Sequence, residues 1–268
     1  MTREPREKRK LERSPLVVVL TEIRFAPILT MASFVPAIQD ELRRQGYPGF
    51  TASAIQQFQF SMAGSEPVIQ STPRWVFTSK DNDEIVSLTY EAISMQTTSY
   101  DDFEAFLEGV RKVVAVIESI AAPSFADRVG LRYVDAVPNI GDSMADYFNE
   151  TVLTFSAADL GVNSILFNQH IIAATDKGHL QIRMSQVEDA PLLPPDLNTP
   201  ELAPIAAART GVHAIFDVDS ADETRSDFTW ETLEERLWGV HQHASSAFWK
   251  SITPQARKTW GEHEGVRL

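Results

Sequence analysis

Residues 127–135 show the alternation of apolar and polar side chains that a strand with one buried face requires. The apolar positions are Val129, Leu131 and Tyr133. The opposite face carries Arg128 and Arg132, with Gly130 between them. The segment follows the strongest helical pattern in the first half of the chain, so we predict that it is a central strand of the sheet.

Two segments place apolar residues at the 3.6-residue period of an amphipathic helix. The segment 100–121 has the clearer stripe, and it carries Asp101 and Glu104 at the spacing of a capping box. The second stripe spans 229–251. Shorter helices are predicted at 34–45, at 144–153 and after Pro254.

Seven further segments are rich in β-branched or alternating residues and predict strands. They are 16–25, 52–61, 74–79, 84–94, 164–175, 179–186 and 211–219. Residues 80–83 and 176–178 supply the turns of two hairpins. A third polar segment, 220–227, is predicted to be a turn as well.

Five prolines between residues 191 and 204 exclude a helix or a central strand there, so we predict an extended loop that crosses the fold. Strands and helices follow one another twice along the chain. The pattern predicts an α+β fold, with mostly antiparallel sheets packed by long helices and with two similar halves, 16–140 and 141–268. A disordered basic tail, 1–15, precedes them. No residue-level repeat supports the duplication.

The composition is that of an ordinary globular protein, with 43% hydrophobic and 23% charged residues. No apolar run reaches the roughly 18 residues of a membrane helix, and no signal peptide is evident. The absence of cysteine excludes disulfides, thiolate metal sites and cysteine nucleophiles. These features favour a cytoplasmic protein that does not enter a membrane.

The net charge of −13 is unevenly distributed. Residues 1–15 carry six basic and three acidic side chains, a net of +3, which leaves −16 for the remainder. The negative charge of the residues after 15 repels the phosphate backbone of nucleic acids. We therefore expect the protein to contact nucleic acid only through the tail, if at all. The alternative is that the tail is a solvated arm.

The polar faces of the predicted strands carry the first candidate site. Its residues are Glu22, Arg24, Glu91, Arg128 and Arg132. Residues two or four apart in a strand point the same way, so each arginine has a neighbour on its own face. If the faces meet, their guanidinium groups could clamp a phosphate or carboxylate of an anionic small molecule. The alternative is that these residues pair with one another or lie on a solvated face.

Two groups of potential metal ligands lack the spacing of a known site. The acidic group consists of Asp217, Asp219, Asp222, Glu223 and Asp227, without the glycine and terminal glutamate of an EF-hand loop. His241 and His243 diverge by roughly 200° on a helix. The remaining strand histidines are His170, His179 and His213. We therefore predict neither a metal site nor a cofactor.

Common catalytic motifs are missing from the sequence. It contains no Gly-x-Ser-x-Gly, no Walker A loop and no Gly-x-Gly-x-x-Gly. Their absence disfavours the common hydrolase, NTPase and dehydrogenase classes. An enzyme whose site is assembled from distant strands would carry no such motif.

Several short segments, in order along most of the chain, resemble a sporadically distributed bacterial protein family. They are residues 14–25, Trp75-Val76-Phe77, Tyr100 with Phe103 and Phe106, 129–134, and Phe248 through Trp260-Gly261. The family has no established activity, so the resemblance implies no catalytic residue and no cofactor. Where the family commonly has Asn, this chain has Asp135. A patchy distribution is typical of genes in mobile elements or anti-phage defence islands.

Two functions remain open from the sequence. The first is a non-catalytic binding or assembly module, with a protein partner or a second copy held by aromatic anchors such as Trp238, Trp249 and Trp260. The second is an enzyme or sensor for an anionic ligand such as a nucleotide. In that case the arginines would be clamps, and Glu22 or Glu91 would be a base or a metal ligand. We expect the first.

Overall fold

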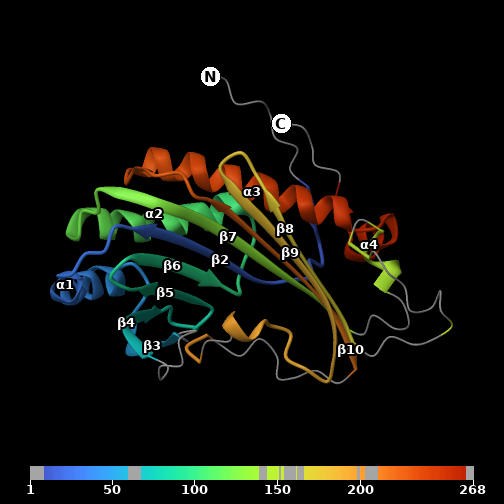
Figure 1. The fold of residues 1–268 in the computed structure, drawn as a ribbon, viewed down its shortest axis with the longest axis horizontal. Helices are drawn as coiled ribbons and strands as arrows, with labels where there is room; N and C mark the ends of the chain where they lie inside the picture. The colour runs from blue at the N-terminus through green and yellow to red at the C-terminus, as the bar shows by residue number, and fades with distance from the viewer. Residues whose placement is uncertain are drawn as a thin grey trace.

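A computed structural model describes residues 9–59, 68–138, 144–150, 152–153, 161, 166–197, 200–202 and 211–263. Within these residues, one antiparallel sheet of ten strands forms the body of the molecule (Figure 1). The strand order is β3–β4–β5–β6–β2–β7–β10–β9–β8, with β11 beside β7. The prediction of an α+β fold with antiparallel pairing is confirmed.

The strands of this sheet differ in length from 2 to 14 residues. The first six along the chain are β2 (Leu16–Phe25), β3 (Gly49–Gln59), β4 (Val68–Thr78), β5 (Glu84–Leu88), β6 (Ala92–Thr97) and β7 (Phe125–Pro138). The others are β8 (Phe167–Ala174), β9 (Gly178–Glu188), β10 (Val212–Asp222) and β11 (Ser226–Asp227). Strands from both predicted halves thus share one sheet. The predicted boundary between the halves falls in 139–143, outside the described residues.

Three helices cover one face of the sheet (Figure 1). They are α1 (Met31–Arg44), α2 (Phe103–Ile120) and α3 (Trp230–Ser251), and the short α4 (Pro254–Trp260) follows α3. With 14, 18, 22 and 7 residues, they are shorter than the long helices that the sequence predicted. No helix among the described residues is long and apolar enough to cross a membrane.

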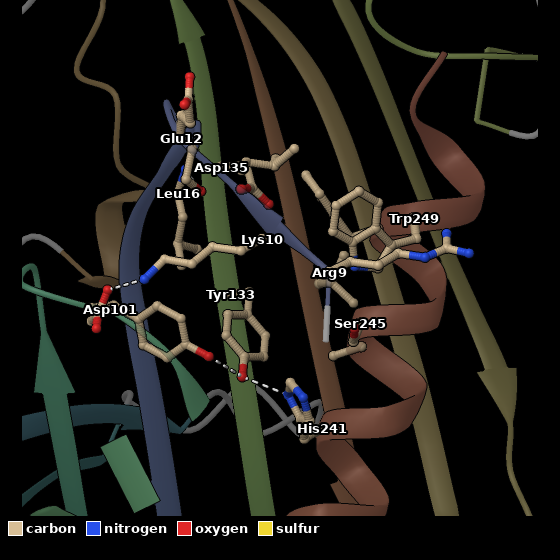
Figure 2. A pocket seen from close by; sticks show the side chains of 16 residues that line it. Arg9, Lys10, Glu12, Leu16, Asp101, Tyr133, Asp135, His241, Ser245 and Trp249 are labelled. Carbon is tan, nitrogen blue, oxygen red and sulfur yellow. Dashed lines mark hydrogen bonds and ion pairs between the residues drawn. The ribbon is translucent and has the colours of Figure 1, made fainter. Parts of the chain in front are cut away.

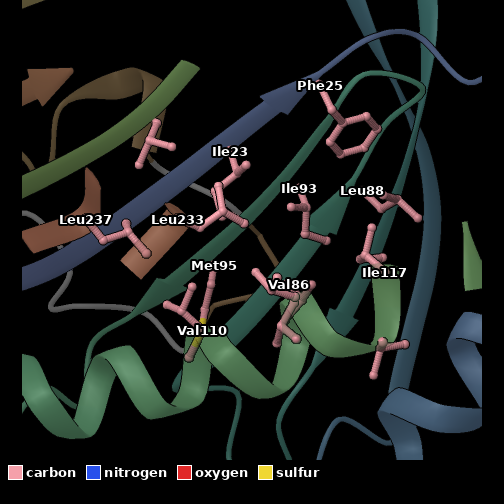
Figure 3. Packing of buried hydrophobic residues seen from close by; sticks show 14 of the residues in the cluster. Ile23, Phe25, Val86, Leu88, Ile93, Met95, Val110, Ile117, Leu233 and Leu237 are labelled. Atoms are coloured by element: carbon pink, nitrogen blue, oxygen red, sulfur yellow. The ribbon is translucent and has the colours of Figure 1, made fainter. Parts of the chain in front are cut away.

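The main core lies between this helical layer and the sheet (Figure 3). Alternate residues of β2, Val19, Ile23 and Phe25, point into it, as the period of two requires. They meet apolar side chains at helical spacing, such as Val110 and Ile117 of α2. Burial of each such side chain contributes about 1.5–3 kcal/mol. The core therefore fixes which face of each strand is left for polar residues.

The proline-rich segment crosses the other face of the sheet, as predicted. Leu197, in the short 3₁₀ helix η3 (Pro195–Leu197), packs against Val18, Val134 and Ile215. Leu202 packs further along, against Val76 and Ile85 of β4 and β5. The described part of the segment therefore reaches from the central strands, at Leu197, to β4 and β5, at Leu202.

Residues 9–15 belong to the fold, although the sequence placed them in a disordered tail. Strand β1 (Lys10–Leu11) pairs with β12 (Glu262–His263). Leu11 is 7% exposed and packs in the cluster that contains Trp260. The polar sequence of residues 9–15 gave no sign of this pairing, because the strand with which it pairs lies about 250 residues away in the chain. Residues 1–8 of the predicted tail lie outside the described residues.

Three local predictions need correction. The segment 84–94 is two strands, since Thr89 Oγ1 accepts hydrogen bonds from the backbone N–H groups of Glu91 and Ala92 and forms a turn. The N-cap of α2 is Asp102, which accepts from Ala105 N at 2.8 Å, rather than Asp101. The predicted helix 144–153 contains only the 3₁₀ turn η1 (Met144–Asp146) among its described residues.

The predicted turn 220–227 is also partly wrong, because β10 continues to Asp222. The acidic residues near the end of β10 stay in the strand because they find arginine partners. Asp219 lies 3.8 Å from Arg128, and Asp222 lies 3.2 Å from the buried Arg236. Paired in this way, carboxylates can occupy a central strand.

Candidate functional site

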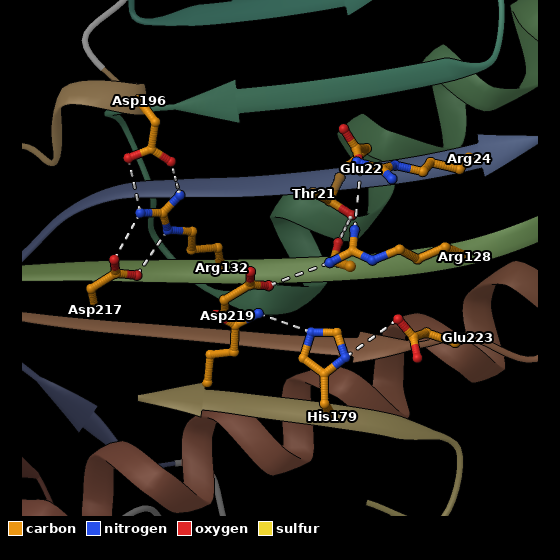
Figure 4. A network of polar contacts seen from close by, with 12 residues as sticks. Thr21, Glu22, Arg24, Arg128, Arg132, His179, Asp196, Asp217, Asp219 and Glu223 are labelled. Atoms are coloured by element: carbon orange, nitrogen blue, oxygen red, sulfur yellow. Dashed lines mark hydrogen bonds and ion pairs between the residues drawn. The ribbon is translucent and has the colours of Figure 1, made fainter. Parts of the chain in front are cut away.

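The face of the sheet away from the helices carries a network of charged side chains (Figure 4). Most of these residues come from β2, β7, β9 and β10, at the positions that alternate with the core residues, and one comes from η3. The network contains the residues Glu22, Arg24, Arg128, Arg132, Arg183, Asp196, Asp217 and Asp219. Four of them were predicted as a candidate site, Asp217 and Asp219 were named only as potential metal ligands, and Arg183 and Asp196 were not named.

Arg132 is the most enclosed arginine of the network. Its Nε and Nη2 donate to the two carboxylate oxygens of Asp217 at 2.8 and 2.7 Å, and its Nη1 donates to Asp196 at 2.5 Å. Burial alone would lower the pKa of the guanidinium, but the hydrogen bonds to Asp217 and Asp196 raise it above its usual value. The side chain is thus a permanently charged cross-link between the sheet and the crossing segment.

Arg128 links β7 to the strands on either side of it. Its Nη1 donates to Glu22 Oε1 at 3.2 Å, and its Nη2 lies 3.8 Å from Asp219. Glu22 also accepts from Arg24 Nε at 2.7 Å. The guanidinium lies over Gly130, where an added Cβ would be 2.6 Å from Nη1. The glycine between the two arginines therefore leaves room for this pairing.

The predicted cleft is only partly formed. Glu22, Arg24 and Arg128 come together, and Arg132 forms a neighbouring group. Glu91 lies in the turn between β5 and β6, where its backbone oxygen accepts from Phe25 N at 2.8 Å and its side chain is exposed, because the expected strand is interrupted there.

Each arginine of the network has a carboxylate partner, including Arg183, which donates to Asp217 at 3.1 Å. Four guanidinium groups therefore face four carboxylates. An anionic ligand would have to displace these partners before it could bind. The geometry thus supports the mutual pairing of these residues rather than an anion clamp.

Two of the strand histidines lie next to this network. Gln181 links them, since its amide lies 3.2 Å from His170 Nε2 and 3.0 Å from His179 Nε2. His179 Nδ1 lies 3.4 Å from Glu223. Among the described residues, no group of three or more His, Asp or Glu side chains has the arrangement of a metal site.

A second polar feature lies on the opposite, helical face, in a pocket of about 300 Å³ (Figure 2). Its walls come from β7, α3, the residues before α2, and the ordered N-terminal segment. Asp135 of β7 points into it, as does Ser245 of α3. The pocket thus joins segments from both ends of the chain.

Asp135 is 4% exposed. Among the described residues, no hydrogen bond or ion pair ends on its carboxylate, although it lines the pocket. Burial, with a smaller contribution from the charge of Asp217, raises its pKa to about 8. Asp135 therefore differs from the carboxylates on the other face in having no arginine partner among the described residues, and it changes its charge near neutral pH.

A short chain of hydrogen bonds forms the wall beside Asp135. Tyr133 Oη lies 2.8 Å from His241 Nδ1 and 3.5 Å from Tyr100 Oη. The His241 ring stacks on Phe103, with centroids 3.9 Å apart and planes 4° apart. Burial raises the pKa of both tyrosines, so they remain neutral hydroxyl groups. These contacts hold the aromatic wall in place.

The mouth of the pocket is bordered by the N-terminal segment. Lys10 Nζ pairs with Asp101, and the Arg9 guanidinium lies 5.5 Å from the ring centroid of Trp249. Both basic residues are located by the β1–β12 pairing described above. The segment that the sequence assigned to the tail thus forms part of the rim.

Sequence reasoning missed the pocket, although one signal was present. Asp135 continues the series Val129, Leu131 and Tyr133, so it lies on the apolar face of β7. An aspartate on a strand face whose other residues are buried is uncommon, and it indicates a buried carboxylate with a functional or structural role. Its tyrosine and histidine neighbours could not be found in this way, because they come from distant segments.

No protein-family model matches the chain, and no curated protein matches its sequence.

Proposed function

We propose that the protein is a non-catalytic binding or assembly module, and that its partner is a second copy of the chain, paired along strand β8. The observation that supports this most is the character of β8. It forms one edge of the sheet, where, among the described residues, it pairs only with β9. An edge strand presents backbone N–H and C=O groups that another strand can pair with.

Strand β8 lacks the features that usually protect an edge. Its sequence, FNQHIIAA, has no Asp, Glu, Lys, Arg or Pro, and it pairs with β9 over eight residues without a bulge. Ile171 and Ile172 are 36% and 64% exposed, on opposite faces of the strand. Lysine, proline and bulges are the common means of preventing edge pairing, so their absence favours a partner.

Symmetry favours a second copy as that partner. Two copies related by a two-fold axis would place their β8 strands antiparallel, which matches every pairing in this sheet. The strand carries no formal charge with His170 neutral, so the contact itself adds no charge repulsion to that between the two acidic chains. The tryptophans predicted as anchors are less suitable, since Trp260 is buried and Trp238 packs on Phe103.

The change Ile172→Lys tests this interface. A lysine there would place two positive charges at the symmetric contact and shield the edge, so a dimer should dissociate. Sedimentation velocity should show wild-type protein at about twice the chain mass of 29.9 kDa and the variant at the chain mass.

The matched control is Ile55→Lys on β3, the opposite edge, where Ile55 is 39% exposed. This variant should remain a dimer. A wild type that is monomeric across micromolar concentrations would contradict the proposal. Dissociation caused equally by both variants would instead indicate β3–β8 contacts between copies.

A further inference from the structure

We propose that the pocket beside Asp135 binds a small organic ammonium ion, whose positive charge pairs with the Asp135 carboxylate. This site lies on the helical face and is independent of the β8 edge. The proposal rests on the carboxylate without a partner, on the balance of charge around it, and on the aromatic wall (Figure 2).

Buried carboxylates elsewhere in this sheet are paired with arginine. Asp217, 2% exposed, accepts two hydrogen bonds from Arg132, and Asp222, 4% exposed, pairs with Arg236. Asp135 is as buried as these two, yet no such contact reaches it within the described residues. A buried charge is costly unless it is paired, so a cation that fills the pocket would supply the missing partner.

The charges around the pocket favour a cation over an anion. Its lining contains three carboxylates, from Glu12, Asp101 and Asp135, and two basic side chains, from Arg9 and Lys10. Lys10 is already held by Asp101, and Arg9 lies against Trp249. The chain as a whole carries −13, which attracts cations. A phosphate or carboxylate would meet the unpaired carboxylate of Asp135 instead.

The walls suit an organic cation better than a metal ion. Tyr100, Tyr133, Phe248 and Trp249 provide aromatic surface, which attracts ammonium groups and packs against apolar ones. A single carboxylate among aromatic rings does not supply the several oxygen ligands that calcium or magnesium requires. A volume of about 300 Å³ is at the lower limit of small-molecule pockets, so the ligand must be small.

Phenethylammonium is a suitable probe because it combines one charged group with one aromatic ring. Titration calorimetry at about pH 8.5 would measure its binding beside two uncharged or anionic analogues, 2-phenylethanol and 3-phenylpropionate. We expect saturable binding of the ammonium compound alone. Equal binding of 2-phenylethanol, or no binding of the ammonium compound at millimolar concentration, would overturn the proposal.

The change Asp135→Asn removes the charge and keeps the shape of the side chain. We expect it to weaken phenethylammonium binding by about tenfold or more, the usual effect of losing a hydrogen bond to a charged group. Glu91→Gln is the matched control, because it removes one carboxylate at an exposed turn, and its affinity should equal that of the wild type. Unchanged affinity in Asp135→Asn would overturn the proposal.

A second variant tests the pocket without altering Asp135. Ser245 lines it from α3, so Ser245→Phe should fill the space and abolish binding. Circular dichroism and the melting temperature would establish that each variant is folded. Binding that survives Ser245→Phe would place the ammonium ion elsewhere and would overturn the proposal even if Asp135→Asn does not fold.

Discussion

Asp135 and Asp217 lie on neighbouring strands and are almost equally buried, yet their surroundings differ. Asp217 faces Arg132 and Arg183, whereas Asp135 faces a pocket on the other side of the sheet. The arginine-bearing face of β7 could be predicted because the alternation of residues is local. The partners could not, since Arg132 pairs with Asp217, 85 positions away. Local pattern thus identifies a polar face but not its contacts.

The raised pKa of Asp135 has a consequence for stability. In the unfolded chain this carboxyl ionises near its ordinary value of 3.8, whereas in the fold its pKa is about 8. The folded state therefore holds one more proton between these values, so the contribution of Asp135 to stability is lost as the pH rises through that range. The expected loss is about 1.4 kcal/mol per pH unit.

The measurement compares the wild type with Asp135→Asn, which cannot ionise. Chemical denaturation from about pH 5 to pH 8.5 should show the wild type becoming progressively less stable than the variant. Other titrating groups contribute equally to both proteins and cancel in the difference. If the two stability curves run parallel across this range, Asp135 has an ordinary pKa and the assignment is wrong.

At the scale of elements, most strands and the three main helices were predictable because their side-chain periods are strong. The segment 84–94 was predicted as one strand because its apolar and polar residues alternate through the turn that Thr89 forms. Strand β10 was longer than predicted because the carboxylate of its last residue, Asp222, pairs with Arg236 of α3. The end of β10 therefore depended on a distant partner, and so did the formation of β1, whereas the types of the long strands and helices did not.

Two glycines in different elements should respond oppositely to alanine. A Cβ at Gly178, at the start of β9, would lie 2.2 Å from the backbone oxygen of Ala221, so Gly178→Ala should cost about 1–3 kcal/mol. A Cβ at Gly239, within α3, would meet no atom within 4 Å. Gly239→Ala should therefore stabilise the protein by about 1 kcal/mol, through helix propensity. Urea denaturation measures both, and a loss of stability in Gly239→Ala would contradict the packing described for α3.

At the scale of the whole molecule, the fold class was predictable and the strand order was not. Counting strands and helices identifies an α+β protein, but nothing in the sequence places β2 between β6 and β7, or joins β1 to β12. The crossing segment was predicted from its prolines, whereas its contacts with β4 and β5 were not. Long-range order depends on packing between segments that are far apart in the chain.

The pairing of the two ends predicts a contribution to global stability. Leu11 is buried beside Trp260, so Leu11→Ala should lower the free energy of unfolding by about 2 kcal/mol or more. Leu29→Ala is the control, since Leu29 is 85% exposed and its truncation should have little effect. Equal stability of the two variants would show that residues 9–15 do not contribute to the fold.

The position of β2 determines how the sheet can assemble. The neighbours β3 to β6 follow one another along the chain, and so do β8 and β9, so each of these groups can form by hairpin steps, whereas the crossing segment separates β9 from β10. Strand β2 lies between the first group and β7, and its Thr21 bonds Gly130, 109 positions away. That contact closes a long loop, an entropic cost that local hairpins avoid. The strands on the β6 side and those on the β7 side become one sheet only when β2 inserts between β6 and β7. Until then the edges of β6 and β7 remain unpaired, so the rate at which β2 inserts determines how long these edges stay exposed during folding.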